Sequence, residues 1–256
     1  MKGSVVCMFT VTQRAGKYSQ PRGGFLKPSS FEKITLRDDV VLSENENIDS
    51  SLIGLAVDYM VRYLYGNEKS NVFNISLAGA KLIGKTKVAK ELINNIKGLD
   101  KKSIVSLCKL VGFDAITRVG INAYRPIEYI NPNEDTINNI IFMINRTKIF
   151  LIGFGPIIKS GGVLMTDNAE FVKIGEFDFI TNDALWDLKV IKKDIQSKHT
   201  LQLLIYYLIY SRNNKINNLK RIGIYNPRKN VIYIKNICEI DKSIIDEVNK
   251  KVIGYK

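Results

Sequence analysis

Apolar residues recur with helical spacing over much of the first 147 residues. After Asp49, which can cap a helix, apolar side chains follow every three or four positions until Gly66. This spacing is typical of an amphipathic helix that buries one face. The same criterion predicts helices over 52–64, 86–97, 101–111 and 133–146.

The pattern changes at about residue 148, where short apolar runs replace the helical spacing. We expect strands or irregular structure over residues 1–48, which combine short apolar runs with Gly, Pro and Ser. The later runs predict strands over 149–154, 162–165, 171–180, 185–191, 221–225 and 231–234, and helices over 197–211 and from 241. This order predicts an α/β (α+β) fold with a mixed central β-sheet flanked by helices.

The 256 residues suit one compact unit with three portions. We divide it into an N-terminal segment (1–48), a helical portion (49–147) and a core (148–256). Lys and Arg number 38 against 25 Asp and Glu, a net charge of +13, and +9 of it lies in residues 187–256. Such a surplus favours nucleic acid as a partner, although a Lys-, Ile- and Asn-rich composition also arises from AT-rich coding.

Cysteine and histidine are too sparse for several common kinds of site. The three cysteines are scattered and His199 is the single histidine, which argues against a disulfide framework and against a zinc site. No apolar run has the length of a membrane span, and the N-terminal run is too short for a signal peptide. We therefore expect a cytoplasmic protein that does not enter a membrane.

The segment 175–190 carries the most informative chemistry. Two β-like runs flank Asn182-Asp183, which suits a two-residue hairpin turn. With that turn, Asp178 lies opposite Asp187, and Glu176 lies opposite Lys189 on the same face. The other face of the hairpin is apolar, with Phe177 opposite Leu188 and Phe179 opposite Trp186.

Opposed carboxylates on neighbouring strands repel one another, so something must compensate them. A divalent cation such as Mg²⁺ or Mn²⁺ would do so, because both prefer oxygen ligands. Lys189 shares the face of Asp187 and could stabilise charge that develops on a phosphate. The alternative is a solvated face in which Glu176 pairs with Lys189 and both aspartates meet water.

The helix expected over 197–211 places His199, Gln202 and Tyr206 on one face. Gln202 lies among apolar residues, and burying its amide is costly unless the amide has a hydrogen-bond partner. Either it is a satisfied core residue beside Tyr206, or this polar face is turned toward the carboxylates.

Asp178, the triplet Asp187-Leu188-Lys189 and the pair Gln202-x-x-x-Tyr206 resemble the PD-(D/E)XK nuclease superfamily, in its RecB-like branch with a QxxxY helix. The resemblance covers residues 174–210 and implies a restriction-endonuclease-like core with an N-terminal helical elaboration. Two positions depart from the family pattern. Asp58 stands where this branch often has His on an early helix, and the triplet begins with Asp where Glu is commoner.

The resemblance implies a Mg²⁺- or Mn²⁺-dependent hydrolase of phosphodiester bonds, with DNA expected ahead of RNA. Asp58, Asp178, Asp187 and the Val190 carbonyl would hold the metal. Lys189, Gln202 and Tyr206 would complete the catalytic set. The nucleic-acid backbone is expected at Lys192, Lys193, Lys198 and His199. A homo-oligomer or a larger nucleic-acid-processing complex is compatible with this interpretation.

Two other interpretations stay open on the sequence. Gly79–Thr86 matches the phosphate-loop pattern G-x-x-x-x-G-K-[ST], which would make the protein a nucleotide-binding protein or ATPase. Its interior, Lys81-Leu82-Ile83, is bulky and equally suits a turn of helix. A nuclease fold kept as an inactive nucleic-acid-binding module is the other, although a pure binder has no need of Asp178, Asp187 and Lys189.

Overall fold

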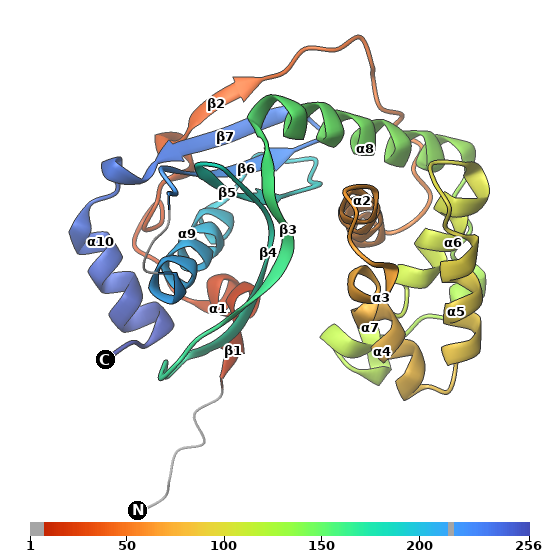
Figure 1. Cartoon of the computed structure of the whole chain (residues 1–256), viewed down its shortest axis with the longest axis horizontal. Coiled ribbons are helices and arrows are strands. Elements are labelled where there is room, and N and C mark those ends of the chain that lie inside the picture. The colour runs from red at the N-terminus through yellow and green to blue at the C-terminus, as the bar shows by residue number, and fades with distance from the viewer. Residues whose placement is uncertain (1–7, 215–217) are drawn as a thin grey trace, which may run out of the picture.

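The computed structural model describes residues 8–214 and 218–256. Within these residues, seven strands form one mixed sheet with helices on both faces, so the expected fold class is confirmed (Figure 1). The elements are β1 (Phe9–Thr10), α1 (Val11–Lys17), β2 (Glu32–Thr35), α2 (Ser50–Leu64), α3 (Lys69–Val72), α4 (Asn74–Leu82), α5 (Thr86–Asn95), α6 (Lys101–Val111), α7 (Asp114–Arg118), α8 (Glu134–Phe154), β3 (Ile157–Met165), β4 (Val172–Thr181), β5 (Ala184–Leu188), α9 (Ser197–Asn213), β6 (Arg221–Asn226), β7 (Val231–Asn236) and α10 (Lys242–Glu247).

The sheet has the strand order β1-β4-β5-β6-β7-β2, and β3 adds to it by pairing with β4. β4 and β5 form an antiparallel hairpin, whereas β5 and β6 are parallel and are joined through α9. A parallel pair needs such a crossover, because two strands joined by a tight turn run antiparallel. The crossover helix therefore starts close to the end of β5, where Lys189 lies.

Each face of the sheet has its own apolar cluster. α1 and α9 cover one face, with Leu204 and Ile224 among the buried residues there. α2 and α8 cover the other face, where Trp186 packs edge-on against Phe150 and Phe154 of α8. This second cluster continues into α4, α5 and α6, so the helical portion shares its core with the sheet.

Most of the expected helices and strands are confirmed, and two expectations are wrong. Asp49 caps α2 through the Ser51 amide, and Asn133 caps α8. Residues 149–154, expected to be a strand, are the last turns of α8, which ends before Gly155-Pro156. Periodicity cannot distinguish a strand from a helix in so short an apolar run. Proline disfavours helical backbone only at the residue before it, here Gly155, so the helix can extend to Phe154. Residues 11–17, expected to be strand or irregular, form α1; residues 1–7 lie outside the described chain.

The hairpin register is confirmed near the turn and changes beyond it. Phe179 pairs with Trp186 and Ile180 with Leu185, as the turn at Asn182-Asp183 requires. The backbone amide of Leu188 then donates to the Asp178 side chain. The apolar face is not continuous, because Phe177 lies in the cluster under α9 and Phe179 in the cluster under α8.

The expected pairing of Glu176 with Lys189 is also wrong. β4 and β5 pair only at Phe179–Trp186 and Ile180–Leu185, and the backbone amide of Lys189 donates to the Tyr225 carbonyl at 2.9 Å. The pairing of β4 with β5 thus ends at Phe179; farther from the turn β4 pairs with β1 at Val172 and Ile174, while β5 stays beside β6. The separation leaves room for side chains between them, at the level of Asp178 and Asp187.

The phosphate-loop motif does not form a loop. Residues 79–82 are the last turns of α4, and Thr86 begins α5. Gly79 packs against α7, since a Cβ there would lie 2.1 Å from the Phe113 carbonyl oxygen. A phosphate loop needs backbone amides turned inward after a strand, so this structure contradicts the nucleotide-binding interpretation of Gly79–Thr86.

In the described part of the chain, no helix is long and apolar enough to cross a membrane.

Candidate active site

Three aspartates and a lysine from separate elements surround the point where β4 and β5 part. Asp58 lies on α2, Asp178 on β4 and Asp187 on β5, and Lys189 directly follows β5. Helix α2 crosses this point, since a Cβ on its Gly54 would lie 3.8 Å from the Cβ of Val190. The structure thus places Asp58 in electrostatic contact with Asp178 and Asp187.

Each carboxylate is compensated by an N–H donor. Arg62 Nη2 lies 2.6 Å from Asp58 Oδ2, and the Leu188 amide donates to Asp178 Oδ2 at 2.6 Å. Lys189 Nζ donates to Asp187 Oδ1 at 3.0 Å. Two oxygens are buried without a hydrogen bond, Asp58 Oδ1 and Asp187 Oδ2, and the latter lies 2.9 Å from Lys189 Nζ outside hydrogen-bond geometry.

The site carries an unfavourable concentration of negative charge. Burial, together with Asp58 and Asp187, raises the pKa of Asp178 well above its usual value, against the opposing effect of Lys189. Burial also raises the pKa of Asp187, and Lys189 partly offsets this. For Lys189 burial alone would lower the pKa, but Asp187, Tyr206 and Asp178 outweigh it and raise the pKa. Lys189 therefore stays a cation at neutral pH and cannot serve as a general base.

These pKa directions predict how stability depends on pH without metal. The folded chain binds a proton at Asp178 more tightly than the unfolded chain, so the stability linked to Asp178 is lost as pH rises from its ordinary pKa of 3.8 through the raised one. Asp178→Asn should therefore stabilise the protein in chelator, and more at neutral pH than at pH near 4. Asp38 is the opposite control, because the hydrogen bond from Arg146 lowers its pKa and Asp38→Asn should destabilise increasingly as pH rises. Denaturant titrations across that range would contradict the prediction if both variants changed with the same sign.

The carboxylates suit a hard divalent cation by chemistry and by their orphaned oxygens. Within residues 8–214 and 218–256, no three Asp, Glu, His or Cys side chains converge into a ready coordination shell. Asp58 Oδ1 and Asp187 Oδ2 are nevertheless buried without a hydrogen bond, and the second is compensated only by the nearby Lys189 ammonium. A Mg²⁺ or Mn²⁺ ion would compensate these oxygens, because both ions prefer oxygen ligands.

Gln202 and Tyr206 of α9 form a buried network with Thr12 of α1. Gln202 Nε2 donates to the Tyr206 hydroxyl at 2.8 Å and to Thr12 Oγ1 at 3.2 Å. Burial and the Asp187 charge raise the pKa of Tyr206 to about 12. Both side chains are buried, and Gln202 fixes the position of the Tyr206 hydroxyl. Sequence analysis missed Thr12, for which it offers no signal.

We expect Gln202→Ala to lower the specific activity of the folded protein strongly and its free energy of unfolding only moderately. Its loss leaves the Tyr206 hydroxyl with only Thr12 at 3.5 Å, which costs roughly 1–3 kcal/mol, and frees the ring beside Asp187. Supporting contacts of this kind change activity by about 10–100-fold. Leu204→Ala on the same helix is the control: it opens a cavity costing about 2–5 kcal/mol but should keep the specific activity of the folded fraction. Paired thermal melts and cleavage assays decide; unchanged specific activity for Gln202→Ala would make this network purely structural.

The expected nucleic-acid contacts lie on the loop after β5 and the first turn of α9. Lys192, Lys193 and Lys198 are exposed, and Lys192 pairs with Glu44 at 3.0 Å. His199 Nδ1 instead accepts the Gln196 amide at 3.0 Å as part of the α9 cap. Burial lowers the pKa of His199 to about 4, with help from Lys189, so His199 is neutral and could only donate a hydrogen bond.

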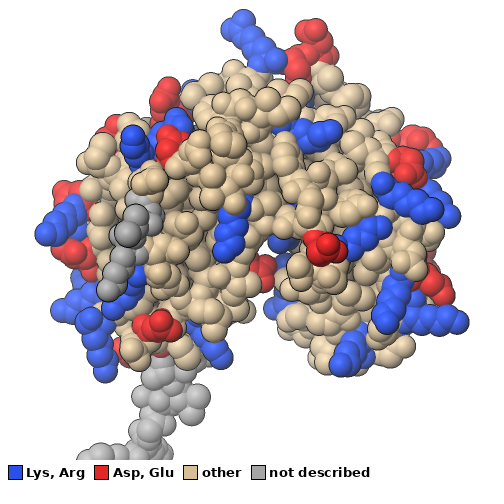
Figure 2. All heavy atoms as spheres, in the orientation of Figure 1, with Lys and Arg blue, Asp and Glu red and all other residues tan. Residues whose placement is uncertain are grey.

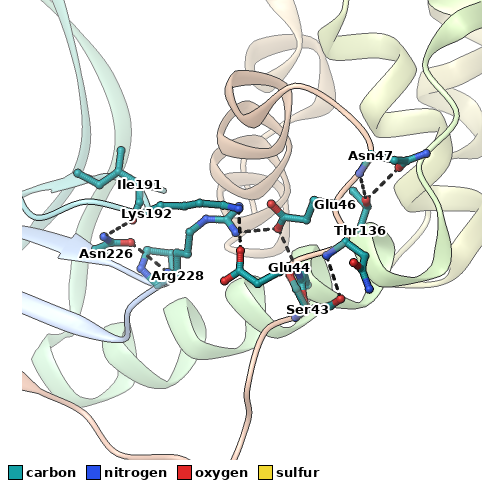
Figure 3. Close-up of polar contacts among 12 residues, drawn as sticks. Ser43, Glu44, Glu46, Asn47, Thr136, Ile191, Lys192, Asn226 and Arg228 are labelled. Atoms are coloured by element: carbon teal, nitrogen blue, oxygen red, sulfur yellow. Dashed lines mark hydrogen bonds and ion pairs between the residues drawn. The ribbon is translucent and has the colours of Figure 1, made fainter.

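A polar chain anchors the loop that follows Lys189 (Figure 3). The Asn226 side chain donates to the Ile191 carbonyl at 2.8 Å, and its Oδ1 accepts the Arg228 amide. Arg228 in turn forms a buried ion pair with Glu46 at 2.7 Å, and Glu46 accepts from Asn139 of α8. The linker between β2 and α2 is therefore tied to the end of the site, which fixes the backbone around Val190.

A cleft opens between the helical portion and the sheet. It has a volume of about 310 Å³ and is lined by α2, the α2–α4 segment, β3 and Glu176 of β4. Figure 2 shows it as a notch at the lower edge, between the two halves of the molecule. Asp58, Asp178, Asp187 and Lys189 are not among its lining residues. The cleft meets the site through Arg62, which lies in its wall and contacts Asp58, and through Glu176, two residues before Asp178. The spacing of Asp58 and Arg62, four residues apart on one helix, is a signal that sequence analysis missed.

Comparisons with protein-family models, with curated proteins and with solved structures found no match to this chain.

Proposed function

We propose that this protein is a metal-dependent nuclease of the PD-(D/E)XK type. The observation that carries the proposal is that Asp58 of α2, Asp178 of β4, Asp187 of β5 and Lys189 just after β5 lie close enough for their charges to interact, and that burial raises the pKa of both Asp178 and Asp187. Such perturbed carboxylates cluster at functional sites, because folding alone does not favour them. The strand–turn–strand–helix order around them is the order that the family resemblance implies.

Asp58, Asp178 and Asp187 would hold the metal, with the Val190 carbonyl nearby. When bound, Mg²⁺ or Mn²⁺ would polarise the phosphate and lower the pKa of a bound water. The chain supplies the rest. Lys189, held on Asp187 at 3.0 Å, places a fixed positive charge where negative charge develops at a phosphate. Tyr206 and Gln202 hold this arrangement from the α9 side.

The substrate would approach over the basic loop after β5. Lys193 and Lys198 are exposed there, and Lys192 could exchange Glu44 for a phosphate, since an exposed ion pair is worth little. DNA remains our expected substrate ahead of RNA, and a homo-oligomer or larger complex remains compatible with the site. A pure binding module would gain nothing from the cost of these buried charges, so we favour the enzyme.

Mn²⁺ titration by calorimetry tests the metal site without relying on turnover. We expect binding to the native chain and a loss of about tenfold or more when Asp178 or Asp187 becomes Asn, the range for weakened metal ligation. Asp183→Asn is the matched control, because this aspartate also pairs with a basic residue, Arg221, but belongs to the turn of the hairpin. No Mn²⁺ binding, or binding equal in all variants, would contradict the proposal.

A further inference from the structure

Arg62 stands out among the groups that the proposed mechanism does not use. Its guanidinium is the cationic group in the wall of the cleft, whose other lining residues are neutral apart from Glu176. The side chain is only 15 % exposed, and its Nε is buried without a hydrogen bond. A buried donor without a partner costs free energy, so this guanidinium is incompletely satisfied where it lies.

Neighbouring residues hold the guanidinium at the mouth of the cleft. The Tyr59 ring lies 4.8 Å from its central carbon, a distance typical of cation–π contact. Across the cleft, Gly161 of β3 has φ +68°, and a Cβ there would lie 3.1 Å from Arg62 Cδ. Gly161 thus leaves the space that an extended arginine needs beside β3.

Asp58 pairs with the guanidinium through one carboxylate oxygen only. Arg62 Nη2 reaches Asp58 Oδ2 at 2.6 Å, while Asp58 Oδ1 is buried without a hydrogen bond. The charge of Asp178 also acts on Arg62 and helps to raise its pKa. A divalent cation and Arg62 would therefore compete for the Asp58 carboxylate. Binding of the cation would weaken the ion pair between Asp58 and Arg62.

We propose that Arg62 is a phosphate-binding residue of the cleft, held in reserve by Asp58 until a cation replaces it there. This rests on the proposed function for its biological setting. A guanidinium binds phosphate oxygens through two parallel hydrogen bonds, and its position beside Asp58 would place a nucleic-acid phosphate next to the metal site. Asn71 and Asn74, which line the same cleft and are exposed, offer further donors to a strand.

The test frees Arg62 without metal or turnover. Binding of a fluorescein-labelled oligothymidylate, and separately of an oligouridylate, is measured by anisotropy in chelator over a series of salt concentrations. Asp58→Asn should bind about tenfold more tightly than the native chain, the scale of a charge-assisted hydrogen bond. Adding Arg62→Gln should remove that gain and reduce the salt slope by about 1.

Asp183→Asn is the matched control, because it releases Arg221 from a similar ion pair and changes the net charge equally. It should give much less than the gain of Asp58→Asn. A gain that survives Arg62→Gln, or equal gains at Asp58 and Asp183, would overturn the proposal.

Thermal melts establish that each variant is folded. If Asp58→Asn does not fold, Arg62→Gln alone is measured with Ca²⁺, where it should weaken oligonucleotide binding about tenfold; unchanged binding would overturn the proposal. Absence of cleavage by the native chain would instead overturn the proposed function, and leaves this anion-binding result standing by itself.

Discussion

Asp187→Asn should abolish nucleic-acid cleavage while the chain stays folded. Asp187 is 2 % exposed and carries both the buried orphan oxygen and the contact with Lys189. Its replacement removes a proposed metal ligand but keeps an oxygen that can accept from Lys189. We expect a loss of about three orders of magnitude or more, the kinetic equivalent of the several kcal/mol that a bound metal contributes.

The measurement is a single-turnover cleavage assay beside a thermal melt in chelator. The fold should survive because burial already disfavours the charged form of Asp187, which Asn does not have. Asp183→Asn, in the turn of the same hairpin, should keep native activity. Full cleavage by Asp187→Asn would remove Asp187 from the proposed metal site.

Lys189→Ala should slow cleavage by about two orders of magnitude, the scale for losing one preorganised charge-stabilising group. A second effect distinguishes its position beside Asp187. Lys189 opposes the rise in the Asp187 pKa, so its loss should raise that pKa further and move the acid limb of the pH–rate profile to higher pH. The variant should therefore recover part of its activity as pH is raised.

Lys85→Ala is the control for this prediction, because Lys85 belongs to the former phosphate-loop candidate and pairs with Glu128 at 3.0 Å. It should cleave like the native chain and keep its pH profile. Native rates for Lys189→Ala, or a loss shared equally by Lys85→Ala, would contradict the role assigned to Lys189.

Local sequence signals predicted the elements that frame the site. Asp49 and Asn133 predicted where α2 and α8 begin, because a capping side chain acts on amides two or three residues away. The two-residue turn at Asn182-Asp183 also acts over a short range, because it sets which residues pair next to it, here Phe179 with Trp186. Thr10 and Gln13 form a capping box that signals α1, although the surrounding Gly and Pro obscured it.

Signals that depend on distant neighbours were beyond the sequence. The apolar run with Phe150 and Phe154 predicted a strand, whereas in the fold both rings pack as helix residues against Trp186, and Phe150 also stacks on Tyr225. The pairing of β4 with β5 ends at Phe179, and Lys189 bonds instead to Tyr225 of β6, which no local pattern encodes. Thr12 joins Gln202 across 190 positions, so its role depends wholly on the fold.

The most direct test of the central claim is cleavage by the purified full chain of labelled single- and double-stranded DNA and RNA, in parallel with Mg²⁺, with Mn²⁺ and with excess chelator. We expect products with either metal, none in chelator, and recovery when metal is restored. Cleavage that persists in chelator, or no cleavage of any substrate with either metal, would contradict a metal-dependent nuclease.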